Sequence, residues 1–175
     1  MRLFLVAGKV SAGKDTIAKF IKEFYDEKGK KTIITAYAKY IKMFAREITG
    51  WDGKEETKPR ALLQKIGSEI RDEIREDFFT HRMYEDLEFY KMFYDNVVIS
   101  DVRLPFEIEY MREMVEDTIS IRVERPGYEG NMTEEEASHI TEHALENYDR
   151  FDFEIENVNL DTLKREVYSI LEGLD

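Results

Sequence analysis

The sequence predicts an α/β fold in which a parallel sheet carries helices on both faces. Short apolar or β-branched runs alternate with longer amphipathic segments, which is typical of βαβ units. Strands are expected at residues 3–7, 31–36, 96–100, 118–123 and 151–156, which gives a five-stranded sheet. Helices are expected at residues 15–25, 37–48, 59–74, 80–94, 105–116 and 161–171, with a capping box at 133–136 for a short additional one. No repeat or linker interrupts residues 1–175, so we expect one domain.

The turn between the first strand and the first helix carries the spacing G-x-x-x-x-G-K, from Gly8 to Lys14. This spacing, with a strand before it and a helix after it, is that of the phosphate-binding P-loop. Glycines let successive backbone N–H groups point at an anion, the helix N-terminus adds partial positive charge, and Lys14 supplies a mobile cation. The sequence therefore predicts a P-loop NTPase fold that binds nucleotide phosphates, with these candidate contacts: Gly8, Ser11, Ala12, Gly13, Lys14, Asp15 and Thr16.

One position of this loop departs from the usual pattern. Ser or Thr normally follows Gly-Lys and its hydroxyl binds Mg²⁺, whereas here Asp15 follows and Thr16 comes one residue later. Asp15 could hold a water of the Mg²⁺ shell, or it could only cap the helix. Both residues are therefore candidate metal contacts.

The composition excludes several classes of protein. A content of 42% hydrophobic and 13% aromatic residues predicts a packed globular domain, and no apolar run is long enough to cross a membrane. With no cysteine and no visible signal peptide, we expect a cytoplasmic protein without disulfides or thiolate metal sites. The net charge of −12 argues against a polymeric nucleic acid as partner, so any anionic substrate must meet a local cluster of cations.

A second polar segment, Asp101-Val102-Arg103, follows the third predicted strand. Ligands of parallel α/β sheets bind beyond the carboxyl ends of the strands, so this segment and the P-loop are expected to converge. Arg103 is a candidate for binding a phosphate through its planar fork, and an ion pair with Asp101 or Glu107 is the alternative. Asp101 could orient a Mg²⁺-bound water, or it could cap a helix.

Several of these residues resemble the deoxynucleoside monophosphate kinase family. The resemblance lies in Gly-Lys-Asp-Thr of the loop, in residues 62–67 (Leu-Leu-Gln-Lys-Ile-Gly) and in residues 101–107 (Asp-Val-Arg-Leu-Pro-Phe-Glu). The C-terminal residues 142–149 and 152–157 are also similar to the related animal-type phosphomevalonate kinases. The resemblance implies a nucleoside monophosphate kinase fold with a helical acceptor-binding insert at about residues 37–95 and a lid at about residues 125–147.

The resemblance also implies an enzyme that transfers the γ-phosphoryl group of ATP, bound with Mg²⁺, to a (deoxy)nucleoside monophosphate. Because two anionic phosphates must meet, Lys14, Arg103 and Arg125 would neutralise charge during transfer. Arg122 and Arg125, just before the lid, would close over the ATP phosphates. The segment Asn157-Val158 would pack on adenine.

The acceptor would lie against the insert. Cations there could bind its phosphate and Gln64 could read a base edge, although each such residue alone is more often a solvated helix side chain. The candidate acceptor contacts are Lys42, Arg46, Gln64, Arg71, Asp101 and Arg103.

Other interpretations stay open. The acceptor could be another small phosphate such as phosphomevalonate, or the chain could be a non-catalytic nucleotide-binding regulator, for which the departure at Asp15 leaves room. A homodimer is also open. Residues His139 to His143 fit H-x-x-E-H, a zinc peptidase pattern. Two surface histidines among glutamates, in the expected lid, are the simpler explanation.

Overall fold

The computed structural model describes residues 1–127 and 143–175. The strands are β1 (Arg2–Ala7), β2 (Thr32–Thr35), β3 (Asn96–Val102), β4 (Thr118–Glu124) and β5 (Phe153–Glu156). The helices of the described residues are α1 (Lys14–Glu27), α2 (Ala38–Thr49), α3 (Arg60–Glu73), α4 (Phe78–Tyr90), α5 (Pro105–Met114) and α7 (Leu160–Leu174). Within those residues no helix is long and apolar enough to cross a membrane.

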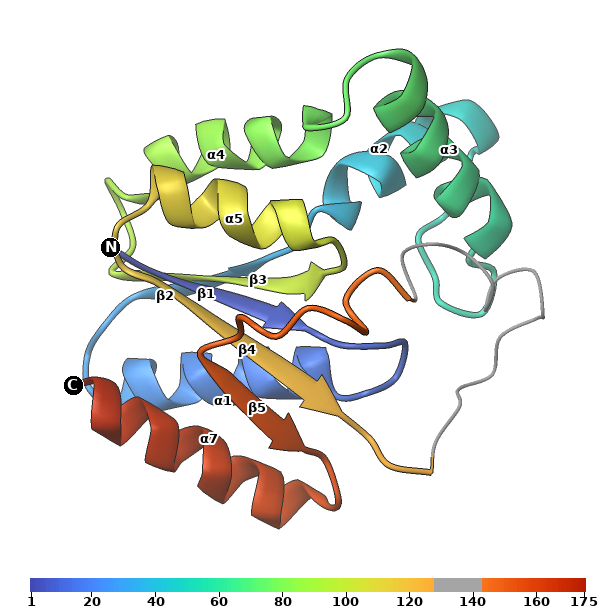
Figure 1. Cartoon of the computed structure of the whole chain (residues 1–175). Coiled ribbons are helices and arrows are strands. Elements are labelled where there is room, and N and C mark those ends of the chain that lie inside the picture. The colour runs from blue at the N-terminus through green and yellow to red at the C-terminus, as the bar shows by residue number, and fades with distance from the viewer. Residues whose placement is uncertain (128–142) are drawn as a thin grey trace.

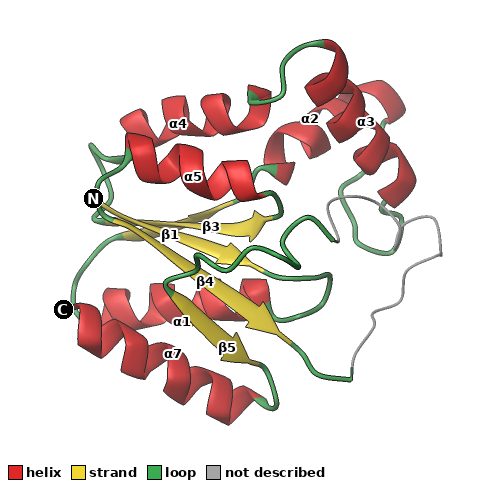
Figure 2. Cartoon of the chain, viewed as in Figure 1, coloured by secondary structure: helices red, strands yellow, loops and turns green. Residues whose placement is uncertain are grey.

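The five strands form one parallel sheet in the order β2-β3-β1-β4-β5. Helices α1 and α7 cover one face of this sheet, and α4 and α5 cover the other (Figures 1 and 2). Helices α2 and α3 pack on each other and project beyond the carboxyl ends of the strands. This is the predicted parallel fold with helices on both faces, and the projecting pair belongs to the segment predicted as the insert.

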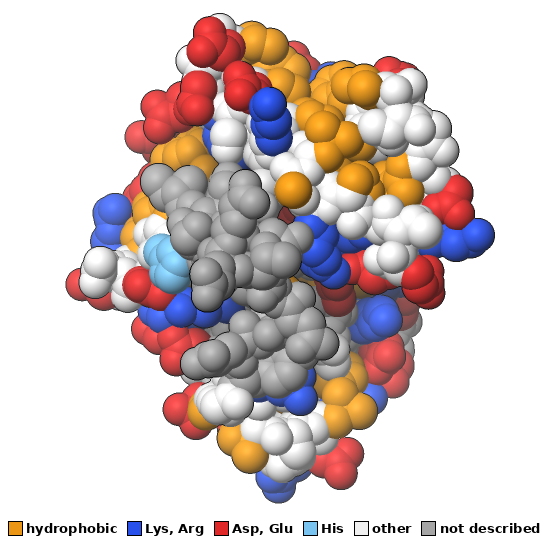
Figure 3. Space-filling view, turned by 90° about the vertical axis from the view of Figure 1, so that its right-hand side faces the viewer, with side chains coloured by type: hydrophobic (Ala, Val, Ile, Leu, Met, Phe, Trp, Pro, Cys, Tyr) orange, Lys and Arg blue, Asp and Glu red, His pale blue; other side chains and the backbone are white. Residues whose placement is uncertain are grey.

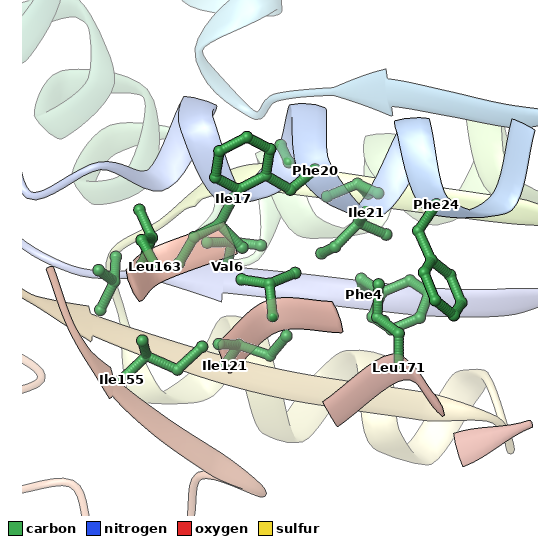
Figure 4. Packing of buried hydrophobic residues seen from close by; sticks show 14 of the residues in the cluster. Phe4, Val6, Ile17, Phe20, Ile21, Phe24, Ile121, Ile155, Leu163 and Leu171 are labelled. Carbon is green, nitrogen blue, oxygen red and sulfur yellow. The ribbon is translucent and has the colours of Figure 1, made fainter. Parts of the chain in front are cut away.

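The central strand β1 explains why the sheet has two cores. Phe4 and Val6 face α1 and α7, whereas Leu3 and Leu5 face the opposite core, and all four are fully buried. A strand that is buried on both faces is apolar at every position, which accounts for the unbroken apolar run at residues 3–7 of β1. Figure 4 shows the first core, in which Phe4 and Val6 meet these side chains from α1, α7 and the neighbouring strands: Ile17, Phe20, Ile21, Phe24, Ile121, Ile155, Leu163 and Leu171.

The carboxyl end of β3 contains an irregularity that serves the site. Leu5 pairs with Ile99 but Ala7 pairs with Val102, so β3 holds one more residue than β1 over this interval. Such a β-bulge re-aims side chains. Ser100 there reaches the start of α1, and Asp101 reaches the start of α2.

Predicted element boundaries differ from the observed ones by up to four residues. The third strand continues to Val102, so Asp101 lies within the strand and not after it. Helix α4 ends at Tyr90 and not at Tyr94. In the turn beyond it, the ring of Phe93 still packs against that of Phe89, with centroids 5.1 Å apart and the ring planes tilted by 49°, so the helical spacing of aromatic residues continues past the helix.

The predicted short helix at 133–136 lies outside the described residues, as does most of the predicted lid.

Candidate active site

The P-loop has left-handed backbone at the positions where it turns. Gly8, Ser11 and Gly13 have φ values of 149°, 59° and 115°. A Cβ atom on Gly8 would lie 2.4 Å from the carbonyl oxygen of Val123, and one on Gly13 would lie 2.6 Å from Nδ2 of Asn157. Both glycines are therefore required by close approach as well as by φ.

Lys14 folds back over this loop. Its Nζ donates hydrogen bonds to the carbonyl oxygens of Gly8, at 2.8 Å, and of Lys9, at 2.7 Å, and the residue is buried. Gly13, at the N-cap of α1, has no side chain to cap the helix, and the N-terminus of a helix favours a bound anion. The loop thus places a cation and a helix N-terminus at the same point.

Asp15 and Thr16 have different surroundings. Asp15 is exposed at the start of α1, and the hydroxyl of Ser100 donates to its Oδ1 at 3.1 Å. Thr16 lines neither of the two cavities that lie beside the P-loop. Of the two loop residues predicted as metal contacts, Asp15 is therefore the one that lines a cavity, next to Ser100 at the end of β3.

Asp101 caps helix α2 from the neighbouring strand. Its two carboxylate oxygens accept hydrogen bonds from the backbone N–H groups of Tyr37, at 2.8 Å, and Ala38, at 2.9 Å. Burial raises the pKa of Asp101, and the two N–H groups, Arg103 and Lys14 oppose that rise. The helix-cap role that the sequence left open is thus present, and a metal would have to use the remaining lone pairs.

Glu107 holds the loop that carries Arg103. Its Oε2 accepts hydrogen bonds from the backbone N–H groups of Arg103, at 2.8 Å, and Leu104, at 3.0 Å. The side chain is buried, and burial raises the pKa of Glu107 to about 7. Glu107, one of the two predicted ion-pair partners of Arg103, therefore binds the backbone N–H of Arg103.

The first cavity, of about 470 Å³, lies between the P-loop, the end of β3 and the insert. Its basic lining residues come from each of these elements: Lys14, Lys42, Lys58, Arg60, Arg71 and Arg103. Figure 3 shows Lys and Arg side chains around the middle of the face that lies at the carboxyl ends of the strands. The local cluster of cations that the net charge required is therefore present. We call this cavity the acceptor-side cavity.

Five of the six candidate acceptor contacts line the acceptor-side cavity: Lys42, Gln64, Arg71, Asp101 and Arg103. Arg46 does not, and its expected role is not supported. Its guanidinium lies 5.7 Å from the ring of Trp51, and a Cβ on Gly53 would lie only 1.9 Å from it. Arg46 therefore packs in the turn after α2.

The sequence reasoning missed Lys58 and Arg60. Both line the acceptor-side cavity, and both pair with Glu55, Lys58 at 3.1 Å. They lie in a polar stretch and at the start of α3, where no periodicity signals which way a side chain points. Pro59 between them was the only local signal of a helix start.

A second cavity, of about 260 Å³, lies on the other side of the P-loop. Arg122 and Arg125 line it, as do loop residues Gly8 and Ala12. Arg103 lines both cavities. We call this one the lid-side cavity, because residues from both ends of the predicted lid segment line it: Arg125, Pro126, Leu145 and Glu146.

Asn157 and Val158 were predicted to contact adenine, and Asn157 packs against the P-loop. Asn157 lines neither cavity; its Nδ2 donates to the carbonyl oxygen of Ala12 at 2.8 Å and lies against Gly13. Val158 is 69% exposed. The structure therefore gives Asn157 a supporting role for the P-loop, and its contact with adenine stays a prediction.

The zinc interpretation gains no support. Nδ1 of His143 lies 3.0 Å from Oε1 of Glu146, and His139 lies outside the described residues. In residues 1–127 and 143–175 no group of three His, Cys, Asp or Glu side chains could hold a metal ion.

The family model "Deoxynucleotide monophosphate kinase" matches residues 23–167. The chain belongs to this family. The match begins after the P-loop, so the loop and the family match are independent observations. No curated protein matches the sequence significantly.

Solved structures of P-loop kinases share the fold. An APS kinase from Mycobacterium tuberculosis, in complex with AMPPNP and APS, has a TM-score of 0.58 at 11% identity, covering 98% of this chain and 97% of its own. Shikimate kinase from Aquifex aeolicus has a TM-score of 0.53 at 14% identity, covering 99% and 97%. With the family match, these likenesses make the chain a P-loop kinase.

We expect Gly13→Ala to weaken nucleotide binding by more than tenfold. The added Cβ must displace Asn157 and adopt a left-handed φ, which distorts the loop where phosphate is held. Calorimetric titration with an ATP analogue measures the effect. Gly29→Ala is the matched control, because Gly29 also has a positive φ but open space around it. Equal losses of affinity in both variants would show that the close approach to Asn157 is not needed.

Glu107 should make stability depend on pH. Its pKa of about 7 in the folded chain exceeds the value of 4.5 when exposed, so its favourable contribution is complete below about pH 4.5 and is lost as pH rises through 7. Glu107→Gln keeps the acceptor oxygen but cannot ionise. Relative to wild type, it should gain up to about 3 kcal/mol of unfolding free energy between pH 5 and pH 8.

Urea unfolding at several pH values measures this difference. Glu113→Gln, an exposed change on the same helix, is the control. A constant difference between wild type and Glu107→Gln across this range would contradict the assignment.

Proposed function

We propose that this kinase transfers the γ-phosphoryl group of ATP to a deoxynucleoside monophosphate, giving ADP and the deoxynucleoside diphosphate. The observation that carries the proposal is that Arg103 lines both cavities while the P-loop separates them. Two phosphates bound on either side would meet at one guanidinium. The family match supports a nucleotide as acceptor.

On the donor side, ATP phosphates would bind the P-loop N–H groups and Lys14. Arg122 and Arg125 in the lid-side cavity would neutralise charge on the same phosphates. Arg122 also lies 5.8 Å from the ring of Phe151 and pairs with Glu124, so its position is restricted before ATP arrives.

On the acceptor side, the phosphate of the monophosphate would meet the basic residues of the acceptor-side cavity. Lys42, Lys58 and Arg60 come from the insert, and Arg103 comes from the sheet. The remaining part of the nucleotide would lie toward Gln64 and Arg71. Arg71 lies 5.7 Å from the ring of Phe79, which restricts its orientation.

The transfer needs no protein base. An oxygen of the acceptor phosphate is already anionic; it attacks the γ-phosphorus in line, and the bond to the β–γ bridging oxygen breaks to release ADP. Catalysis then consists of positioning and charge neutralisation, with Lys14 and Arg103 acting at the transferred group.

Mg²⁺ fits the residues near the loop. Asp15 and Ser100 offer oxygen atoms, which Mg²⁺ prefers, and the exposure of Asp15 leaves room for the waters that Mg²⁺ retains. When bound, the ion would supply further positive charge to the donor phosphates.

The test is ADP release from ATP·Mg²⁺ with each deoxynucleoside and ribonucleoside monophosphate and with phosphomevalonate. We expect turnover on one or more deoxynucleotides. Lys14→Ala should lower kcat by about 10²–10³-fold, because it removes a donor at the transferred group. Lys19→Ala, an exposed change on the same helix, should not.

Turnover on phosphomevalonate alone would mean that the acceptor is phosphomevalonate and not a nucleotide. ATP binding without turnover on any acceptor would favour a regulatory role. Circular dichroism of Lys14→Ala separates loss of activity from loss of fold.

A further inference from the structure

Tyr37 lies at the floor of the acceptor-side cavity. It precedes α2, its backbone N–H is held by Asp101, and its side chain packs in the core with Tyr40 and Phe79. The residue is only 4% exposed. Its position is therefore fixed both by the backbone and by the surrounding core.

The hydroxyl of Tyr37 is buried and has no hydrogen-bond partner in the described part of the chain. The neighbouring Tyr40 differs, since its hydroxyl donates to Oδ2 of Asp86 at 2.7 Å. A buried hydroxyl without a partner destabilises a protein, and phenylalanine would fill the same space without that cost. Tyr37 is one of the residues that line the cavity, so a hydroxyl there that the fold does not use indicates a ligand.

Two carboxyl groups lie near this hydroxyl. Burial raises the pKa of Tyr37 well above its usual value, and Glu107 and Asp101 raise it further, so the hydroxyl keeps its proton. The acceptor oxygens of these carboxyl groups favour a hydroxyl hydrogen that points toward them, which leaves the lone pairs of Oη for a ligand. Glu107 also lines the cavity, and its hydrogen bonds within the described residues end on Oε2.

We propose that Tyr37, with Glu107 beside it, is a specificity-determining contact that accepts a hydrogen bond from the uncharged part of the acceptor. The donor would be a sugar hydroxyl or a base amino group. Glu107 and Asp101 lie at this floor of the cavity and disfavour a phosphate there. The acceptor phosphate would instead bind the basic residues that line the rest of the cavity. This inference rests on the proposed function.

The test compares wild type with Tyr37→Phe on pairs of acceptors that differ by one donor. One pair is dGMP and its 3′-deoxy analogue; the other is dGMP and dIMP, which lacks the 2-amino group. If dCMP is the best acceptor, the second pair is dCMP and its analogue with hydrogen in place of the 4-amino group, and the first pair is dCMP and its 3′-deoxy analogue. The variant should lose about tenfold in kcat/KM on the nucleotide that carries the donor and change little on the analogue.

The pair that shows this difference identifies the donor as a sugar hydroxyl or a base amino group. Thermal unfolding of the free protein gives a second readout. Tyr37→Phe should leave the midpoint unchanged or raise it, since it removes an unpartnered hydroxyl.

Tyr40→Phe is the matched control, because it removes a hydroxyl that is partnered and lies outside the cavity lining. It should lower the unfolding midpoint and leave acceptor selectivity unchanged.

The inference is overturned if Tyr37→Phe changes kcat/KM equally for every acceptor, or for none, while wild type is active. If wild type transfers phosphate to no nucleotide, the proposed function itself fails and this inference fails with it. The two failures are therefore distinguished by the wild-type enzyme alone.

Discussion

The carboxylate of Asp101 links the sheet to the insert, and the arrangement of the site depends on it. Through the bulge in β3, this side chain reaches the N-terminus of α2 and accepts hydrogen bonds from two backbone N–H groups there. The start of helix α2 and the P-loop therefore line the same cavity. The negative charge of Asp101 is offset by Lys14 and Arg103, which are the cations that the proposed transfer requires.

Charge is distributed unevenly in this acidic chain. A net charge of −12 coexists with a cavity whose lining is rich in Lys and Arg. In the free protein these cations are balanced locally, as Glu55 balances Lys58 and Arg60. Such balance lets a basic cavity persist without ligand, and the cations then reduce the repulsion between two approaching phosphates.

Much of the fold could be predicted from the sequence, because its signals are local. The P-loop spacing and the unbroken apolar run of β1 each determine their own structure. The orientation of insert side chains could not be predicted. Lys42 and Arg46 are one helical turn apart on α2, yet only Lys42 lines the acceptor-side cavity, because Arg46 packs on the turn with Trp51. The unpartnered hydroxyl of Tyr37 depends on tertiary packing that no local pattern records.

In the proposed reaction, ATP in the lid-side cavity and the monophosphate in the acceptor-side cavity bring their phosphates together at Arg103. Calorimetric titration with a bisubstrate analogue, adenosine joined to a deoxynucleoside through five phosphates, tests this arrangement most directly. If both ends bind at once, the analogue should bind at least about 100-fold more tightly than ATP or the monophosphate alone. Affinity no greater than that of ATP would mean that the cavities do not hold both nucleotides in line, and would contradict the account.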